Sequence, residues 1–323
     1  MIKVMTCRML SVVICGVLLM ATSVSAMDTW PNRQINLVVP FPPGGGADQL
    51  GRIVAEQLAA EMGQPVVVEN RAGAGGAIGS LHVVRANADG YTLLVGSVAN
   101  VLNHYYHDEP AYDVRKDLVP VAQLIQYPNY LAVKPSSPFN SIEDIVQYAK
   151  SHPNKLSCAN SGVGTSQWLS CFLLNSLANV DIVNVPYRGG IPSLQDTISG
   201  QVDMVFAVDA LPFINDGRLK GIAVSTPERS PYATNLPAIG EIFTGYDITS
   251  WVGVFAPAGT PEDVVKKLST SMQKILENEK VRERMAVLGA TPVMRPYAQF
   301  AEYVELEFNR WGQILGPLNI RLN

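Results

Sequence analysis

Short apolar segments rich in β-branched residues alternate along the chain with longer amphipathic segments. The short segments predict strands and the longer ones predict helices. This alternation is typical of parallel strands joined through helices, as in α/β proteins. We expect strands over 35–39, 66–68, 93–95, 131–133, 156–159, 182–185, 202–208 and 222–224. We expect helices over 48–62, 261–276, 281–288 and 297–315.

Two helix starts carry capping residues. Ser141 stands three residues before Asp144, which is the spacing of a capping box. Thr260 precedes Pro261 and Asp263, which predicts an N-cap, a proline at the first helical position and a capping partner. We therefore expect one helix to begin after Ser141 and another after Thr260.

A strand, a glycine-rich turn and a helix follow one another twice, over 35–62 and over 156–177. Two α/β lobes, each with one such turn, would face each other across a cleft. The N-terminus of a helix carries unpaired backbone N–H groups and a partial positive charge. Two helix N-termini that converge therefore predict a site for an anion that needs no lysine or arginine.

The first 26 residues have the pattern of an export signal. Lys3 and Arg8 precede a mostly apolar segment over 10–21, and small residues end at Ala26, where we expect cleavage. The apolar segment is shorter than the ~20 residues that span a bilayer. A lipoprotein signal would need a small residue where Ile14 precedes a cysteine. These features predict an exported, soluble protein in the periplasm.

Composition and charge narrow the class of partner. Of the 323 residues, 47% are hydrophobic and 16% are charged, so the chain can bury enough apolar surface to fold. The net charge is −4 and no block of five like charges occurs, which argues against nucleic acid and anionic membranes as partners. Cys158 and Cys171 would be the only thiols after export, either as a disulfide or as two buried free thiols.

The glycine-rich segments lack the motifs of nucleotide-binding and catalytic loops. Ile78 occupies the place of the third glycine of a dinucleotide fingerprint, and no glycine precedes Lys-Ser or Lys-Thr as in a P-loop. Ser161 lacks the flanking glycines of a nucleophile elbow. His104 and His107 lie beside acidic residues without a third ligand at metal spacing, which fits a polar surface loop. We expect no metal and no cofactor, and nothing in the sequence places a nucleophile beside a base.

Seven segments, in order along nearly the whole chain after the export signal, carry a resemblance to one family. They are 41–48 with Arg52, 69–76, 88–93, 161–164, 185–189, 200–204 and 251–261. The first reads Phe-Pro-Pro-Gly-Gly-Gly-Ala-Asp. In these segments the chain resembles the substrate-binding proteins of tripartite tricarboxylate transporters, the Bug family.

The resemblance implies a two-lobed periplasmic-binding-protein fold of the Venus flytrap, type II, with two Rossmann-like lobes joined by two crossing strands. Lobe 1 would comprise 27–125 and 250–323, and lobe 2 would comprise 126–249, with the hinge near 124–131 and 251–255. Such a protein, which we expect to be a monomer, captures a small carboxylate and delivers it to integral-membrane permease subunits. The ligand could be a dicarboxylate, an acidic amino acid or an aromatic acid.

The resemblance also implies a set of ligand-binding residues. They are Phe41, Gly44, Gly45, Gly46, Ala47, Asp48, Ser161, Gly162, Gly164, Thr165, Ser166 and Asp209. Glycines let the backbone approach the ligand, hydroxyls donate to carboxylate oxygens, and Phe41 would stack on or cover the ligand. We expect Asp48 to be the N-cap of its helix. Asp209 either meets an ammonium or hydroxyl group of the ligand or is a solvated loop acid, and Trp168 fits the core better than the ligand.

Three departures from the family pattern leave the ligand open, namely Ile191 before Pro192, an altered segment over 236–239, and Asp209 at the end of its strand. Two other functions also stay open. An exported hydrolase would use a serine of the second loop, such as Ser161, and would turn over simple esters. An extracytoplasmic sensor partner would bind the same ligand but dock on a signalling receptor.

Overall fold

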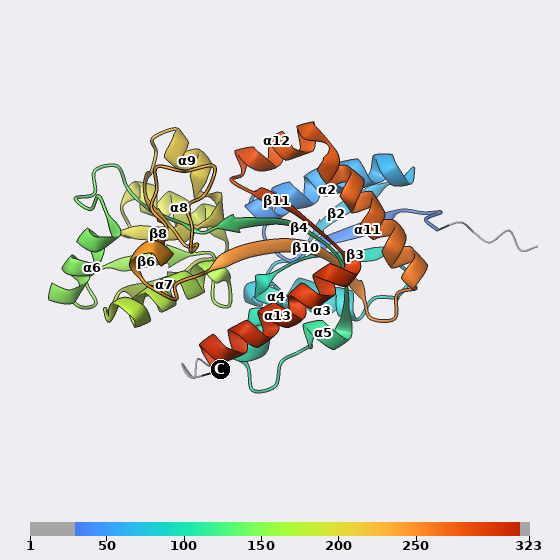
Figure 1. The fold of residues 1–323 in the computed structure, drawn as a ribbon, viewed down its shortest axis with the longest axis horizontal. Helices are drawn as coiled ribbons and strands as arrows, with labels where there is room; N and C mark the ends of the chain where they lie inside the picture. The colour runs from blue at the N-terminus through green and yellow to red at the C-terminus, as the bar shows by residue number, and fades with distance from the viewer. Residues whose placement is uncertain (1–29, 317–323) are drawn as a thin grey trace, which may run out of the picture. The chain divides into compact units, whose positions relative to one another are not determined.

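Two β-sheets organise the chain from Arg33 onward (Figure 1). The structure is a computed structural model that describes residues 30–316, so the expected signal peptide over 1–26 lies outside the described residues. Of the described residues, 30–32 belong to a separate unit from the chain that begins at Arg33. No helix within 30–316 has both the length and the apolar character needed to cross a membrane.

The first sheet has six strands in the order β11-β4-β10-β3-β1-β2. Strand β1 pairs in parallel with β2 and β3, whereas β3, β10, β4 and β11 pair antiparallel. Four of the five β1 residues are apolar because helices cover both faces of this sheet. The strands are β1 (Ile35–Val39), β2 (Val66–Asn70), β3 (Thr92–Ser97), β4 (Leu118–Pro128), β10 (Thr249–Pro257) and β11 (Thr291–Pro296).

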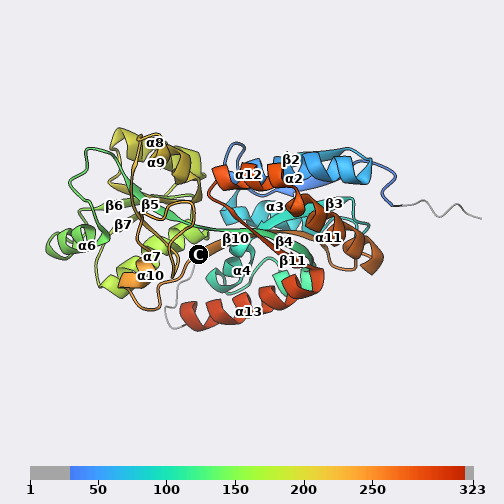
Figure 2. The same ribbon diagram turned by 45° about the horizontal axis from the view of Figure 1, so that its top comes forward.

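Helices lie on both faces of the first sheet. Helix α2 packs with α11 and α12, and α13 packs with α4 on the other face, as both ribbon views show (Figure 2). These and the smaller helices of this part are α2 (Gly46–Met62), α3 (Ala77–Val84), α4 (Val98–Tyr106), α5 (Val114–Asp117), α11 (Glu262–Glu277), α12 (Glu279–Val287) and α13 (Tyr297–Leu315), with a 3₁₀ turn η1 (Ala74–Gly76).

The second sheet has five strands in the order β7-β6-β8-β5-β9. Strand β6 pairs in parallel with β7 and β8, and β5 pairs antiparallel with β8 and β9. The strands are β5 (Tyr130–Val133), β6 (Ser157–Asn160), β7 (Val183–Pro186), β8 (Met204–Ala207) and β9 (Lys220–Val224). The helices are α6 (Ile142–Ser151), α7 (Ser166–Ala178), α8 (Gly190–Ser199), α9 (Leu211–Asn215) and α10 (Ile239–Ile242), with a 3₁₀ turn η2 (Val208–Ala210).

Alternate residues of β8 reach opposite faces of the second sheet, as the period of a strand requires. Met204 and Phe206 belong to the buried cluster that contains residues of α6 and α7. Val205 and Ala207 belong to the cluster that contains Leu194 of α8 and residues of α9. The second sheet is therefore covered on both faces, like the first.

Two segments connect the sheets. β4 continues into β5 through Asn129, and β10 pairs with β4 along its whole length (Figure 1). One cluster of buried side chains contains residues of both sheets, including Leu94 of β3 and Leu131 of β5. The predicted two α/β sheets joined by two crossing strands are thereby confirmed.

Several predicted elements have the observed bounds, and others do not. The strand over 35–39, the helix over 297–315 and the capping box of Ser141 and Asp144 are confirmed. The Thr260 cap is wrong, because α11 begins at Glu262 and the Thr260 hydroxyl donates to the Pro257 carbonyl at 2.8 Å. Strand β11 was not predicted.

Candidate functional site

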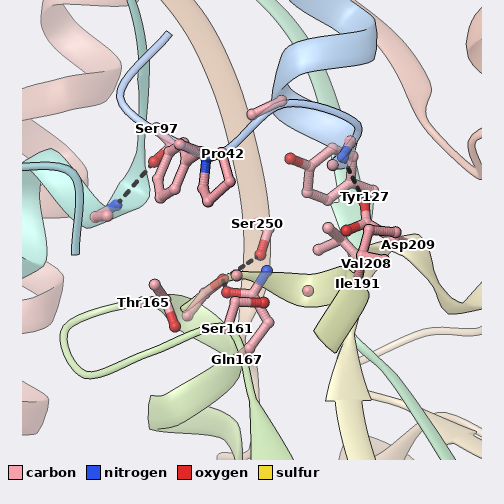
Figure 3. Close-up of a pocket in the computed structure, with 18 of the residues that line it drawn as sticks. Pro42, Ser97, Tyr127, Ser161, Thr165, Gln167, Ile191, Val208, Asp209 and Ser250 are labelled. Atoms are coloured by element: carbon pink, nitrogen blue, oxygen red, sulfur yellow. Dashed lines mark hydrogen bonds between the residues drawn. The ribbon is translucent and has the colours of Figure 1, made fainter. Parts of the chain in front are cut away.

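A cavity of about 280 Å³ lies where loops of both sheets meet the crossing strands. It opens at the carboxyl ends of parallel strands, which is where open α/β sheets bind their ligands. Figure 3 shows that its labelled side chains come from several separate elements. The lining residues are Phe41, Pro42, Pro43, Gly45, Gly46, Ala47, Ser97, Val98, Ala99, Tyr127, Ser161, Thr165, Ser166, Gln167, Arg188, Gly189, Gly190, Ile191, Pro192, Val208, Asp209, Ser250 and Trp251.

The first loop connects β1 to α2 and brings its glycines to the cavity wall. Gly45 is the N-cap of α2, so the sequence-based assignment of that role to Asp48 is wrong. Asp48 lies within the first turn of the helix, and its carboxylate accepts a hydrogen bond from the Gly44 N–H at 2.9 Å. Gly44 has a φ of +86°, which only glycine adopts at little cost. Gly44 and Asp48 thus hold the loop in shape and do not line the cavity.

Asp48 is 2% exposed and is held by three side-chain hydrogen bonds as well as the Gly44 N–H. Arg52 donates to both carboxylate oxygens at 2.9 and 3.0 Å, and Asn70 donates to Oδ1 at 2.8 Å. Burial by itself would raise the pKa of Asp48, but the hydrogen bonds from Arg52, Gly44 and Asn70 together hold it below its usual range. The ionised form of Asp48 is therefore part of the folded structure.

The second loop connects β6 to α7. Thr165 is the N-cap of α7: its hydroxyl accepts from the Trp168 N–H at 3.3 Å and donates to the Gly162 carbonyl at 2.7 Å. Gly162 has a φ of +121°, and a Cβ there would lie 2.9 Å from the Tyr187 carbonyl oxygen. A Cβ at Gly164 would lie 3.0 Å from the Asn103 side-chain oxygen. Both glycines therefore shape the loop without lining the cavity, whereas Thr165 does line it.

Ser161 and Ser166 both line the cavity but differ in their partners. The Ser166 hydroxyl lies 2.6 Å from the Ser250 hydroxyl of β10 and belongs to a buried polar network. Asn129, at the β4–β5 junction, accepts from Ser250 at 3.1 Å in the same network. The Ser161 hydroxyl has no hydrogen bond to any residue within 30–316, so it can donate to a ligand.

Two further helix N-termini reach the cavity, and the sequence reasoning missed both. Ser97 caps α4 in a capping box with Asn100, and Gly189 is the N-cap of α8. The Ser-x-x-Asn spacing at 97–100 and the paired glycines at 189–190 were available signals. The expected number of converging helix N-termini was two, and the structure brings four together, those of α2, α4, α7 and α8.

Arg188 is a positively charged residue that the sequence reasoning did not place at the site. It is exposed and lines the cavity beside the start of α8. Its guanidinium has no ion-pair or hydrogen-bond partner in the described part of the chain. We expected an anion site that needs no lysine or arginine, whereas in the structure the Arg188 guanidinium lies at the cavity.

Asp209 follows β8 and reaches the start of α2. Its Oδ1 accepts a hydrogen bond from the Gly46 N–H at 2.7 Å, as the dashed line in Figure 3 marks. Burial raises the pKa of Asp209 to about 6, against a lowering by the Gly46 hydrogen bond. This carboxylate lines the cavity and is half-buried, so it is not a solvated loop acid.

Apolar side chains form much of the remaining wall. Phe41 lies against Gly76, where a Cβ would be 3.4 Å from its ring, and it lines the cavity. The Trp251 side chain is fully buried and packs on Phe300. Trp168 does not line the cavity: its ring packs edge-on against Tyr106 at 5.5 Å. Ile191, one of the departures from the family pattern, lies at the cavity in the first turn of α8.

Two other groups of residues lie apart from the cavity. Cys158 and Cys171 are free thiols, both buried, and burial raises the pKa of the Cys158 thiol. The His104 ring packs on Phe308 with ring centroids 4.6 Å apart. Within residues 30–316, no group of three or more His, Cys, Asp or Glu side chains could hold a metal ion.

Solved structures similar to this chain share its fold over most of its length. The periplasmic binding protein BugD has a TM-score of 0.86 and 31% identity, covering 91% of this chain and 100% of BugD. Rpa4515 of R. palustris with adipate has a TM-score of 0.84 and 33% identity, with 89% and 98% covered. MatC of Rhodopseudomonas palustris with bound malate has a TM-score of 0.82 and 34% identity, with 88% and 100% covered.

The match to a family covers more than half of the chain. Residues 50–320 match the tripartite tricarboxylate transporter family receptor. This is a family of binding proteins and not of enzymes, so the hydrolase alternative is wrong. With the two sheets, the crossing strands and the cavity between their loops, the chain belongs to the tripartite tricarboxylate transporter receptor family, the periplasmic solute-binding proteins that include BugD.

Proposed function

We propose that this protein binds a small carboxylate in the cavity between the two loops and delivers it to the permease of a tripartite tricarboxylate-type transporter. The ligand would lie between lobe 1, over 27–125 and 250–323, and lobe 2, over 126–249. The crossing segments near 124–131 and 251–255 would act as the hinge. Closure would then depend on contacts that the ligand makes with both lobes.

The observation that carries this proposal is the convergence of the N-termini of α2, α4, α7 and α8 on one cavity. Each helix start offers backbone N–H groups without intrahelical partners and a partial positive charge. Arg188 adds a full positive charge without a competing partner in the described chain. Such a site favours an anion, and a carboxylate can accept hydrogen bonds from Arg188 and from helix starts, except from the Gly46 N–H, which donates to Asp209.

Similar proteins support a carboxylate as the ligand. Rpa4515 was solved with adipate and MatC with malate, and both are dicarboxylates. The similarity to this chain covers 98% of Rpa4515 and 100% of MatC. We infer that the present cavity takes an acid of comparable size.

The predicted site residues divide into two roles under this proposal. Gly45, Gly46, Ala47, Ser161 and Ser166 would contact the ligand, with Phe41 as an apolar cover. Gly44, Asp48, Gly162, Gly164 and Thr165 would shape the two loops, because their hydrogen bonds and contacts are made within the protein.

Thermal unfolding tests the proposal directly. The purified protein is unfolded and refolded to remove any co-purified ligand, and then heated with mono-, di- and tricarboxylates, amino acids and aromatic acids. A ligand at about 100 times its Kd stabilises the folded state by ~2.7 kcal/mol, which shifts the midpoint visibly. A shift confined to carboxylates supports the proposal. No shift with any member of the panel contradicts it.

The Ser161 hydroxyl provides a matched test of the site. Replacing it in Ser161→Ala removes one donor to the ligand, so we expect the Kd of the best carboxylate to rise about 3- to 10-fold. Ser199→Ala is the control, because Ser199 is exposed at the end of α8 and donates only to the Asp196 carbonyl. Calorimetric titration should show an unchanged Kd for Ser199→Ala, and an equal change in both variants would contradict the site.

Periplasmic location and monomeric state are further parts of the proposal. The family is one of periplasmic binding proteins, and residues 1–26 have the pattern of an export signal. We expect the protein in the periplasmic fraction as a monomer whose chain begins at Met27. Intact-mass measurement of that fraction, with light scattering of the purified protein, checks both points.

A further inference from the structure

The Asp209 carboxylate is built into the cavity wall by glycines on two sides. Oδ1 accepts from the Gly46 N–H, and a Cβ at Gly46 would lie 2.4 Å from that oxygen. A Cβ at Gly190 would lie 2.4 Å from Oδ2. Because any larger residue at Gly46 or Gly190 would displace the carboxylate, the start of α2 and the start of α8 form a cradle around Asp209.

One oxygen of this carboxylate is used within the protein and the other is not. Oδ1 is occupied by the first turn of α2, so the positive end of that helix already has an anion beside it. Oδ2 has no hydrogen-bond partner within 30–316 and is not among the buried unsatisfied atoms. An accessible acceptor therefore faces the space in which a ligand would lie.

The charges that line the cavity have opposite signs and are not paired with each other. Arg188, Tyr127 and Asp209 are the titratable side chains of the lining. Burial raises the pKa of Tyr127, so this phenol is neutral near pH 7. Arg188 and Asp209 form no ion pair in the described structure, which leaves one cation and one anion available to a ligand.

A dicarboxylate matches only one of these charges. Its first carboxylate can bind at the starts of α4 and α7, where Ser97 and Thr165 lie apart from Asp209 in Figure 3. Ser161 lies closer to Asp209, because a Cβ at Gly190 would be 3.5 Å from the Ser161 hydroxyl and 2.4 Å from Oδ2. Its second carboxylate would have to approach the ionised Asp209 or leave the cavity, and like charges at close range are strongly unfavourable in a partly dry site. An ammonium or hydroxyl group at the same position would instead donate to Oδ2.

We propose that Asp209 is a specificity-determining residue, which makes the cavity prefer a carboxylate with a hydrogen-bond donor at its far end over the dicarboxylate of the same length. This inference rests on the proposed function and narrows its ligand to amino or hydroxy acids. Phe41, Pro42 and Ile191, which are half-buried at the cavity, provide an apolar surface for the chain between the two polar ends.

Matched ligands test the preference without any substitution. Adipate, 6-aminohexanoate and 6-hydroxyhexanoate share six carbons and one carboxylate and differ only at the far end, as succinate, 4-aminobutanoate and 4-hydroxybutanoate do at four carbons. Calorimetric titration of the protein at pH 7.5 should give a Kd at least 10-fold lower for the better amino or hydroxy acid than for the dicarboxylate of its length. A dicarboxylate that binds more tightly than both of its partners overturns the inference and leaves the proposed function intact.

Variants assign the preference to Asp209. Asp209→Asn keeps the shape and removes the charge, so the preference for the amino acid should fall at least 10-fold, and Asp209→Ser should do the same. Asp216→Asn is the control, because Asp216 is exposed and paired with Arg218 outside the cavity. An unchanged preference in the folded Asp209 variants overturns the inference. If no acid of either series, and no other carboxylate, binds the wild type, the proposed function and this inference fail together.

Discussion

Asp48, which is buried, and Asp209, which is half-buried, are two carboxylates near the start of the same helix, and their surroundings differ. Asp48 accepts hydrogen bonds from Arg52, Asn70 and Gly44, which outweigh its burial and keep its pKa low. Asp209 accepts only from the Gly46 N–H, so burial dominates and raises its pKa to about 6. The first carboxylate stabilises the folded protein, whereas the second lowers its stability near pH 7.

Removal of the Asp48 charge tests the first half of this contrast. In Asp48→Asn the side chain loses part of its bonding to Arg52 and Gly44, so we expect a loss of about 1–3 kcal/mol in the free energy of unfolding at pH 7. Because the folded pKa is lowered, the contribution of Asp48 is present above the unfolded pKa and disappears as the pH falls through the folded value. Urea titrations at pH 7 and at pH 3 measure both parts.

The exposed pair of Asp216 and Arg218 is the control for this loss, since their side chains are 45% and 55% exposed. Surface ion pairs contribute about 0–1 kcal/mol, so Asp216→Asn should change stability by less than Asp48→Asn does. Equal losses would mean that the bonding of Asp48 adds nothing beyond a surface pair.

The thiols of Cys158 and Cys171 should be protected by the fold. Both are buried, and burial raises the pKa of the Cys158 thiol, so little reactive thiolate is present at neutral pH. We expect an aromatic disulfide reagent to modify neither thiol in the native protein and both in guanidinium without reductant. Reaction of neither thiol in guanidinium would show that the periplasmic protein carries a disulfide.

At the scale of elements, the sequence predicts best where periodicity is uninterrupted. The strand over 35–39 and the helix over 297–315 have the bounds that the pattern indicates. Strand β11 begins and ends near prolines, all its residues are half-buried, and it bulges in its pairing with β4, so it shows no alternation. Its place in the sheet depends on a partner distant in sequence, which no local pattern reveals.

The same limit applies to the candidate site. Its two loops could be located because glycines are clustered at 41–48, and glycine, serine and threonine are clustered at 161–166. Arg188, Ser97 and Trp251 join them only when separate strands bring their ends together. The role of Asp48 was misassigned because the helix begins at Gly46, two residues before it, and sequence alone rarely fixes a helix end so closely.

The cap of α7 couples the stability of that helix to the site. In Thr165→Ala the helix loses the bond to the Trp168 N–H and the loop loses the bond to the Gly162 carbonyl. We expect a loss of about 1 kcal/mol in stability and a weaker affinity for the carboxylate ligand. Ser141→Ala removes the equivalent cap of α6, away from the cavity, and should cost similar stability at unchanged affinity. Equal ligand affinities of the two variants would show that the Thr165 cap does not affect ligand binding.

At the scale of the whole molecule, the buried polar network around Asn129 joins the crossing segments to the cavity. The Asn129 N–H donates to Ser225 at 2.8 Å, its side-chain amide donates to Ser170 at 2.8 Å, and its oxygen accepts from Ser250 at 3.1 Å. Ser250 in turn contacts Ser166 at the start of α7. Through these hydrogen bonds, the second loop contacts both segments that connect the sheets.

The pKa of Asp209 is shifted in the opposite direction to that of Asp48, which leads to the final prediction. Its folded pKa of about 6 exceeds the ordinary value of 3.8, so between these pH values the folded protein binds more protons than the unfolded chain and stability falls as the pH rises. Asp209→Asn avoids this cost, and we expect it to be more stable than the wild type by about 1–2 kcal/mol at pH 7.5, with the gain vanishing near pH 4.

Urea titrations of both proteins from pH 4 to pH 7.5 measure the difference in unfolding free energy, in which the other titrating groups cancel. Asp48→Asn, followed in parallel, should lose stability relative to the wild type over the range in which Asp209→Asn gains it, because the two pKa shifts have opposite signs. A gain that is independent of pH, or a loss at pH 7.5, would contradict a carboxylate kept ionised against burial. A gain confined to high pH would mean that the folded protein holds an unfavourable charge at its cavity, which a donor from the ligand to Oδ2 would offset.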